Sequence, residues 1–248
     1  MADLQSVAHR PYPPPPGAWA MAQVWHDLLF AHWPVAVQDL RGHVPPQLSL
    51  DTFGGSGWVG IVPFRMSGVR PRQLPAVPWL SAFPELNVRT YVTVGGISGV
   101  YFFSLDAGNP VAVALGRGIF KLPYFRARMT LRRVDDAVAY TSQRRHSGAP
   151  PAELTARYRP TGPVFAAATG SLEWWLTERY SLYTVDARGR AVRTGIHHRQ
   201  WQLQPAEAAI GRNTMAAAHD LVLPPLTPLL HFARRQDVIV WPPSNVPG

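Results

Sequence analysis

Three polar side chains alternate with apolar ones in the segment 83–91, where Glu85, Asn87 and Arg89 lie two residues apart. On a β-strand this spacing places all three on one face and the intervening leucine and valine on the other. If the polar face lines a cavity, Arg89 can hold a carboxylate in a planar fork, with Asn87 beside it, while Glu85 supplies acid–base chemistry. If that face meets solvent, the same alternation is an ordinary half-exposed strand.

Lys121 is the one lysine in the chain, and it stands between Phe120 and the pair Leu122 and Pro123. An apolar environment can turn an amine into a nucleophile that attacks carbonyl groups. The alternative explanation is a compositional bias, since all of the remaining Lys and Arg residues, 24 in total with Lys121, are arginines. Under such a bias a single lysine carries little information about chemistry.

The histidines form no regular metal-binding pattern. His197 and His198 are adjacent, so on a strand they point to opposite faces. His26 and His32 do not share a helix face, and the HExxH spacing is absent. Two histidines from distant segments could still meet. The nucleophile-elbow motif is also absent, and the glycines at 54–57 lack the residues of a phosphate loop. We therefore predict no metal and no cofactor.

The elements that position these residues begin with a proline-rich arm over residues 1–17, which cannot form a helix or a central strand. Apolar residues then recur at helical spacing from Ala18 to Trp33, just before Pro34, and predict a helix. A second, short helix is predicted from Val35 to Arg41.

Beyond Asp51 the pattern changes to short apolar runs bounded by glycine and proline, which predict strands. The predicted strands are Gly57–Phe64, Leu86–Val94, Gly99–Leu105, Tyr124–Val134, Ala137–Arg144, Tyr180–Val185, Ala191–Ile196 and Leu230–Trp241. Glycine-rich connections at 94–99 and 186–189 predict antiparallel hairpins.

Brief helices are predicted for Val111–Arg117 and for Gly170–Thr177, the latter with Ser171 as its N-cap. We see no β-α-β alternation that would support a parallel sheet. The predicted fold class is therefore α+β, with mostly antiparallel strands that close into a barrel or a strongly bent sheet and a few short helices.

Length and composition limit the classes of protein to which the chain can belong. With 248 residues, of which 46% are hydrophobic, the chain can bury a sizeable core. We expect a single domain over residues 18–241 and a C-terminal tail over residues 242–248. No apolar run is long enough to span a membrane, no signal peptide is evident and no cysteine is present. These features predict a soluble, cytoplasmic protein without a membrane partner.

The net charge of +9 and the isoelectric point near 10.6 raise the question of nucleic-acid binding. The arginines, however, are scattered singly or in pairs among apolar segments, and no helix-turn-helix or zinc-finger pattern occurs. A solvated basic surface is the favoured interpretation, and nucleic acid is a disfavoured partner.

Long motifs spread from about Trp25 to Trp241 carry a family resemblance. They are Phe30–Pro34, Val44–Pro45, Leu50–Gly55, Trp58–Phe64, Val69–Pro71, Phe83–Val92, Gly99–Asp106, Leu122–Tyr124 and Glu178–Tyr183. In these motifs the chain resembles the YqjF-like family, a conserved group known as domain of unknown function 2071. That family name confers no activity.

The family is similar, more distantly, to acetoacetate decarboxylase, whose fold is a cone-shaped antiparallel β barrel around its active site. The resemblance implies that fold here, and it implies assembly into homo-oligomers. The decarboxylase pattern of a Tyr-x-Glu strand, a glycine hairpin, a Gly-Arg-Glu turn and a Pro-Lys-Lys segment is matched by residues 83–85, 95–101, 116–118 and 123–125. Glu85 falls on the active-site glutamate of that pattern.

Two departures separate the chain from a lysine-dependent decarboxylase. Tyr124 stands where the Schiff-base lysine follows the proline, and Phe125 replaces the second lysine. Gly118 replaces the glutamate of the turn. Lys121 lies three positions before Tyr124, so on a regular strand it projects from the opposite face, unless a bulge at residues 122–123 reverses the alternation.

Together these observations predict a cavity that binds a small, anionic carbonyl or carboxylate metabolite, anchored by Arg89 and facing Glu85 and Tyr124. If the protein is an enzyme, the residues suit metal-free proton transfer by a lyase, hydratase or isomerase, with Glu85 as base and Tyr124 as donor. Alternatives are a non-catalytic binding or sensing module and, less favoured, a nucleic-acid or protein-interaction role. Further predicted contacts to the ligand are Asn87, Tyr101, Arg117 and Trp58. The tryptophans are most simply core residues, although Trp25, Trp33, Trp58 and Trp79 could also form walls of the cavity.

Overall fold

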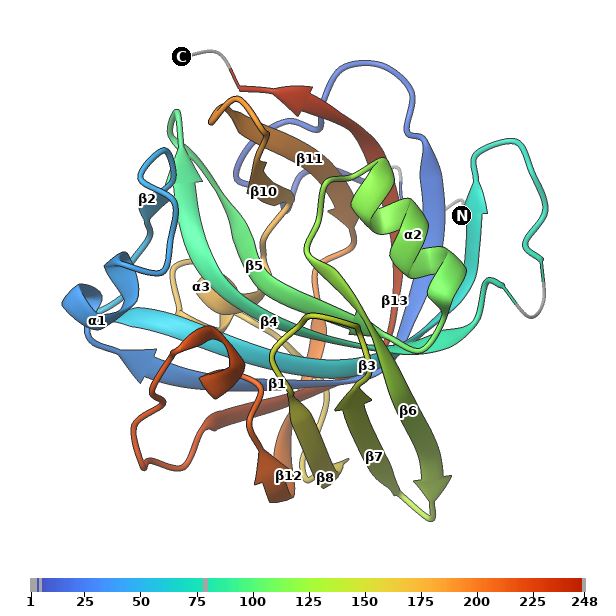
Figure 1. Ribbon diagram of the computed structural model, residues 1–248, viewed down its shortest axis with the longest axis vertical. Coiled ribbons are helices and arrows are strands. Elements are labelled where there is room, and N and C mark those ends of the chain that lie inside the picture. The colour runs from blue at the N-terminus through green and yellow to red at the C-terminus, as the bar shows by residue number, and fades with distance from the viewer. Residues whose placement is uncertain (1–3, 5, 78–79, 247–248) are drawn as a thin grey trace.

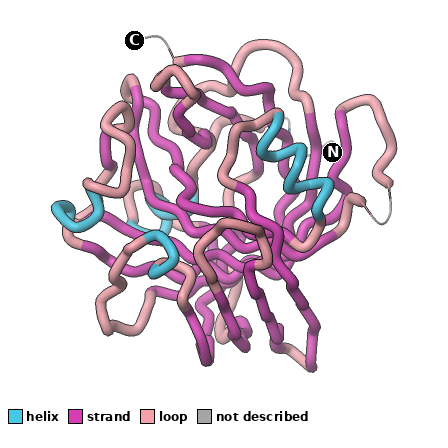
Figure 2. The backbone as a smooth tube through the Cα atoms, viewed as in Figure 1, coloured by secondary structure: helices cyan, strands magenta, loops and turns pink. Residues whose placement is uncertain are grey.

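The computed structural model describes residues 4, 6–77 and 80–246. Strands form the body of the molecule within those residues, and the helices are short segments at its periphery (Figure 1 and Figure 2). The strands are β1 (Met21–Val35), β2 (Ser49–Leu50), β3 (Gly57–Pro71), β4 (Phe83–Val94), β5 (Ile97–Ala107), β6 (Tyr124–Val134), β7 (Ala137–Arg144), β8 (Glu153–Pro160), β9 (Phe165–Ala166), β10 (Ser181–Val185), β11 (Ala191–His198), β12 (Gln202–Asn213) and β13 (Leu229–Asn245). The helices are α1 (Val37–Arg41), α2 (Pro110–Gly118), α3 (Leu172–Thr177) and the 3-10 helix η2 (Ala217–His219).

The strand pairings close on themselves. The order β4-β3-β1-β13-β11-β10-β5 returns to its start, because β5 also pairs with β4. Strands β6, β7, β8 and β12 leave this ring at β5 and rejoin it where β12 pairs with β13. Every pairing is antiparallel except β5 with β6 and β10 with β5. The predicted mostly antiparallel, strongly bent sheet with a few short helices is therefore confirmed.

The helix predicted from Ala18 to Trp33 is wrong, because this segment is the long strand β1. Asp27 has a left-handed backbone (φ 55°) and has no register partner on β3 or β13, so it forms a bulge. The bulge reverses which side chains face inward, from odd-numbered residues before it to even-numbered residues after it. Because β1 is largely buried on both faces and contains a bulge, its apolar residues do not alternate regularly. Their spacing happens to match a helical period, which explains the wrong prediction.

The other predicted strands are found, although β3 continues seven residues beyond the predicted end at Phe64 and β13 continues four residues beyond Trp241, and the short helices at α1, α2 and α3 are confirmed. The Ser171 hydroxyl caps α3 by accepting from the Trp174 amide. The hairpin between β4 and β5 turns through Gly95 and Gly96, whose φ angles of 56° and 76° suit glycine.

Two features of the topology were not predicted from the sequence. Strands β5 and β6 are parallel neighbours joined through α2, so one β-α-β unit is present despite the expectation of none. Strands β8 and β12 were not predicted, since they carry exposed arginines, alanines and a glycine where strands usually carry branched residues.

The first described residues pack across the sheet. The Arg10 guanidinium donates to the Ile196 carbonyl at 2.9 Å and lies 4.2 Å from the centre of the Tyr180 ring. The Tyr12 hydroxyl donates to the Ser98 carbonyl at 2.7 Å. At the other end of the chain, β13 continues past Trp241 to Asn245. Within the described residues, every helix is too short or too polar to cross a lipid bilayer.

Candidate active site

A cavity of about 540 Å³ lies inside the ring of strands. Its walls come from β1, β3, β4, β5, β6, β10, β11, β13, α2 and α3, together with the loop between β3 and β4 and the segment between α2 and β6. Most of the side chains that line it are apolar, including Phe30, Phe64 and Phe102. The few polar groups in this wall are therefore the ones that can orient a ligand.

Strand β4 supplies a row of polar groups to the cavity. Glu85, Asn87 and Arg89 all line it, whereas Leu86 and Val88 are fully buried in the core on the other face of the strand. The alternative of a solvent-facing strand is wrong, because Glu85 is 2% exposed and Asn87 is 6% exposed. The roles predicted for these side chains remain predictions.

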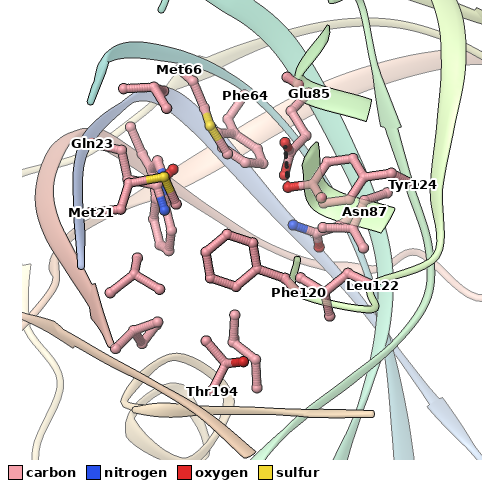
Figure 3. A pocket seen from close by; sticks show the side chains of 18 of the residues that line it. Met21, Gln23, Phe64, Met66, Glu85, Asn87, Phe120, Leu122, Tyr124 and Thr194 are labelled. Atoms are coloured by element: carbon pink, nitrogen blue, oxygen red, sulfur yellow. Dashed lines mark hydrogen bonds between the residues drawn. The ribbon is translucent and has the colours of Figure 1, made fainter. Parts of the chain in front are cut away.

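Glu85 forms a hydrogen-bonded pair with Tyr124, the first residue of β6. The Tyr124 hydroxyl donates to Oε2 of Glu85 at 3.0 Å, and both side chains face the cavity (Figure 3). Burial raises the pKa of Glu85 to about 8; the hydrogen bond from Tyr124 opposes this shift and the negative charge of Asp106 adds to it. Burial, reinforced by Glu85, also raises the pKa of Tyr124 well above its usual range.

Helix α2 fixes the position of the Tyr124 ring. A Cβ atom added to Gly116 would come within 2.4 Å of the ring, so only glycine allows this close approach. The guanidinium of Arg117 donates to the Tyr124 carbonyl at 2.9 Å. The parallel pairing of Leu105 with Tyr124 sets the height of the tyrosine along the cavity wall.

Lys121 lies outside the cavity. Its side chain is exposed and its backbone is left-handed (φ 55°), whereas Phe120 and Leu122 on either side of it line the cavity (Figure 3). The turn therefore directs the amine away from Glu85 and Tyr124, but Lys121 precedes β6 and is not on the regular strand that the three-residue offset assumed. This geometry gives no support to a Schiff base at Lys121.

Three other predicted ligand contacts do not line the cavity. Tyr101 lies on the opposite face of β5 from the lining residues Val100 and Phe102, and it packs edge-on against Phe103. Trp58 lies further along β3, where its indole donates to the Phe53 carbonyl at 3.4 Å. Arg117 is exposed and holds the backbone of Tyr124 from outside.

Of the tryptophans predicted as cavity walls, Trp25 lines the cavity, as does Trp201, which was not predicted. Trp33 donates its indole N–H to the Leu226 carbonyl and does not line the cavity, and Trp79 lies outside the described residues. The rings of Trp25 and Trp201 stack with their centres 6.0 Å apart.

The segment between α3 and β12 contributes further lining residues that the sequence did not indicate. They are Thr177, Arg179, Thr194, Ile196, His198 and Trp201. Arg179 is paired with Asp51 at 2.6 Å. Burial lowers the pKa of His198 to about 3, so this imidazole is neutral. His197, its neighbour, faces Arg10 on the other side of β11.

Several polar atoms in the cavity wall have no partner among the described residues: Asn87 Oδ1, Arg89 Nε, and the indole nitrogens of Trp25 and Trp201. Arg89 donates to the Leu176 carbonyl at 3.3 Å and lies over the Phe30 ring, and no described carboxylate pairs with it. A buried polar atom without a partner costs about 1–3 kcal/mol. A bound molecule with an anionic oxygen would satisfy the nitrogen donors of this set, and one with a hydroxyl group would satisfy Asn87 Oδ1.

Metal ligands are not gathered in the described part of the chain, where no three His, Asp or Glu side chains come together in a suitable group. The Glu85–Tyr124 pair and Arg89 bring acid–base groups and a positive charge to the cavity wall.

Comparison with known proteins agrees with this architecture. Two solved structures share the fold: acetoacetate decarboxylase from Legionella pneumophila, with a TM-score of 0.62 and 14% identity over 96% of this chain and 92% of that one, and the enduracididine biosynthesis enzyme MppR complexed with pyruvate, with a TM-score of 0.61 and 11% identity over 95% and 91%. At these identities the likeness concerns the fold alone.

Sequence comparison gives the family. The chain is 49% identical to the uncharacterized protein YqjF of Bacillus subtilis (strain 168) over 228 residues, which cover 92% of this chain and 93% of that protein. Residues 22–237 match the family model DUF2071, described as an uncharacterized conserved protein. The chain therefore belongs to the DUF2071 family and has an acetoacetate decarboxylase-like fold.

Proposed function

We propose that this protein binds a small organic acid with a carbonyl group in its cavity and transfers a proton on it, without a Schiff-base lysine. The observation that carries the proposal is the buried Glu85–Tyr124 pair, which faces a predominantly apolar cavity that also contains Arg89. The binding of pyruvate by MppR, which shares this fold, supports the same class of ligand.

In this proposal Arg89 holds the carboxylate of the ligand. Its guanidinium has no carboxylate partner among the described side chains, and its Nε is free to donate. The apolar surroundings strengthen such an ion pair, since few protein or solvent dipoles compete with it. The side-chain carbonyl oxygen of Asn87, also without a partner, can accept from a hydroxyl group of the ligand.

Glu85 would act as the base. The Glu85 carboxylate takes a proton from the carbon next to the ligand carbonyl, and the Tyr124 hydroxyl donates a hydrogen bond to the enolate oxygen that develops. Return of the proton to a different carbon gives an isomerase, and departure of a neighbouring group gives a lyase or dehydratase. A pKa of about 8 suits a base that operates near neutral pH.

The experiment is deuterium incorporation from heavy water into a panel of oxo acids, followed by proton NMR. We expect Glu85→Gln to lower the exchange rate by a factor of about 100 or more while leaving ligand affinity, measured by thermal shift, nearly unchanged. Exchange that persists at the wild-type rate in this variant would refute the role of Glu85. Binding without exchange in the wild type would instead indicate a binding or sensing module.

A matched control is Glu178→Gln. Glu178 is also buried and also accepts a hydrogen bond from a tyrosine, Tyr180, but neither residue lines the cavity. This variant makes the same chemical change in a second buried Glu–Tyr pair. We expect it to retain exchange.

A further inference from the structure

The outer part of the cavity wall is apolar and exposed. Among the described residues, Leu74, Val77, Leu115 and Ile119 are large hydrophobic side chains with 58%, 43%, 50% and 56% of their surface exposed. All four also line the cavity. Large exposed apolar groups that gather at one place mark a binding site.

Two elements that face each other form this outer wall. On α2, Ala112, Leu115 and Gly116 lie at helical spacing with the C-cap residue Ile119, and all four line the cavity. The loop between β3 and β4 contributes Leu74, Pro75, Val77 and Leu80. In Figure 1 this loop and α2 lie on the same side of the molecule.

The inner part of the same cavity has the opposite character. It contains the carboxyl group of Glu85, the hydroxyl of Tyr124, the amide of Asn87 and the guanidinium of Arg89. Met66, Phe83 and Phe120 are among the apolar side chains of the remaining lining, and Figure 3 shows Met66 and Phe120. The cavity therefore gathers these polar groups at one place, and most of its remaining lining is apolar, with Gln23, Thr194 and His198 among the exceptions.

We infer that the ligand is an amphipathic acid, whose oxygen-bearing head lies against Arg89 and Glu85 and whose unbranched apolar tail of medium length runs out between α2 and the β3–β4 loop. A short oxo acid would leave the four outer side chains exposed and much of the 540 Å³ unfilled by ligand atoms. A tail would remove these side chains from water, which is the main favourable term in binding an apolar group.

The outer side chains are continuous with the cavity lining, and for this reason we assign them to the ligand and not to a second copy of the chain. This inference rests on the proposed binding function but not on proton transfer. Each methylene that enters the apolar wall should tighten binding by about fourfold at most, the value for full burial.

The test is a titration of the full-length protein by calorimetry with butyrate, hexanoate, octanoate, decanoate and dodecanoate. The expected result is an affinity that rises with each pair of methylenes and levels off once the tail reaches solvent. Leu115→Ser combined with Ile119→Ser should flatten this rise while leaving the affinity for butyrate unchanged.

Val222→Ser combined with Leu226→Ser is the matched control. These two side chains are also exposed, at 85% and 58%, but they do not line the cavity. We expect the control to retain the wild-type dependence on chain length. Light scattering on all three proteins shows whether either pair of changes alters the oligomeric state.

An affinity that does not depend on chain length would overturn the inference. So would an unaltered chain-length dependence in the Leu115/Ile119 variant, or a change in that variant confined to the oligomeric state, which would assign the patch to a protein interface. If short oxo acids bind and exchange while longer acids bind no tighter, only the tail assignment fails. If octanoate binds tightly but Glu85→Gln leaves exchange intact, only the proton-transfer function fails.

Discussion

The buried environment of Glu85 disfavours its negative charge and raises its pKa. The hydrogen bond from Tyr124 reduces this increase in pKa. The phenol is the one side chain in the described structure that donates a hydrogen bond to the Glu85 carboxyl group. The tyrosine therefore has two successive effects, since its single proton stabilises the carboxylate of the base and can turn to the oxygen of a ligand once Glu85 has taken up a proton. These effects separate experimentally, because only the first changes the titration of Glu85.

Tyr124→Phe should raise the pKa of Glu85 further above 8, because the hydrogen bond that favours the carboxylate is removed. If Glu85 is the base, exchange needs the ionised form, so the rate should rise with pH and the variant should reach its plateau at higher pH. The pH dependence of deuterium incorporation measures this. If the pH profile of the variant is the same as that of the wild type, Tyr124 does not affect the pKa of Glu85.

Glu85 should also make stability depend on pH. Its pKa is raised in the folded protein, from an ordinary 4.5 to about 8, so the folded state binds the proton more tightly than the unfolded state does. The resulting stabilisation is complete below pH 4.5 and is lost as the pH rises through 8. Between pH 5 and 8 the wild type should lose roughly 2–4 kcal/mol more stability than Glu85→Gln does. Urea unfolding at several pH values measures the free energy of unfolding of both proteins. The same dependence on pH in the wild type and in Glu85→Gln would contradict the prediction.

Strand β4 and helix α2 show how single elements position the site. The alternation of Glu85, Asn87 and Arg89 could be predicted because β4 keeps its alternation there and is buried on both faces, and the extra residue of the register shift between Val88 and Arg89 lies on β5. The positions of Tyr101 and Trp58 could not, because they depend on which face of β5 is turned inward and on how far the cavity extends along β3. The residues contributed between α3 and β12 carry no local pattern, since they meet β4 only through the closure of the barrel.

Gly116→Ala should displace the Tyr124 ring. The added methyl group would lie 2.4 Å from the ring, and the overpacking should cost about 1–3 kcal/mol despite the better helix propensity of alanine. Exchange activity should fall as well, because the hydroxyl can no longer reach Glu85.

Gly118→Ala, in the same helix, is the control, since nothing lies within 4 Å of its added Cβ. We expect Gly118→Ala to retain both the stability and the exchange activity of the wild type. Equal melting temperatures for the two variants would show that the ring and Gly116 are not tightly packed in solution.

At the scale of the whole molecule, sequence could predict the bent, mostly antiparallel sheet but not how it closes. The regular strands with short hairpins were evident locally. The bulge at Asp27 hid strand β1, because a left-handed aspartate in the middle of a strand leaves no signal in an apolar pattern. The carboxylate of Asp27 pairs with Arg133 of β6, and its carbonyl accepts from Tyr158 of β8 at 2.8 Å, so the bulge is held by segments more than a hundred residues away.

The N-terminal arm is a second long-range feature, and the division at residue 17 stays a prediction. The described part of the arm crosses β10 and β11, and the Pro15 ring fills the space that a side chain at Gly195 would need. Deletion of residues 1–17 should therefore lower the free energy of unfolding by several kcal/mol, since buried contacts of Arg10 and Tyr12 are lost.

Chemical denaturation compares the truncated and full-length proteins, with Tyr12→Phe expected to lose about 1 kcal/mol on its own. An unchanged midpoint in the truncated protein would show that the arm is a separate appendage. A truncated protein that fails to fold would show that the arm belongs to the domain.

The orientation of Lys121 makes the chain unusually easy to label. Apart from the α-amino group, its exposed side chain is the only amine in the molecule, and the residues on both sides of it line the cavity. An amine-reactive fluorophore attached there would lie outside the cavity, beside Phe120 and Leu122, and would leave Glu85 and Tyr124 unmodified. One covalent step would thus convert the protein into a reporter whose emission follows the entry of candidate ligands, without engineering a cysteine.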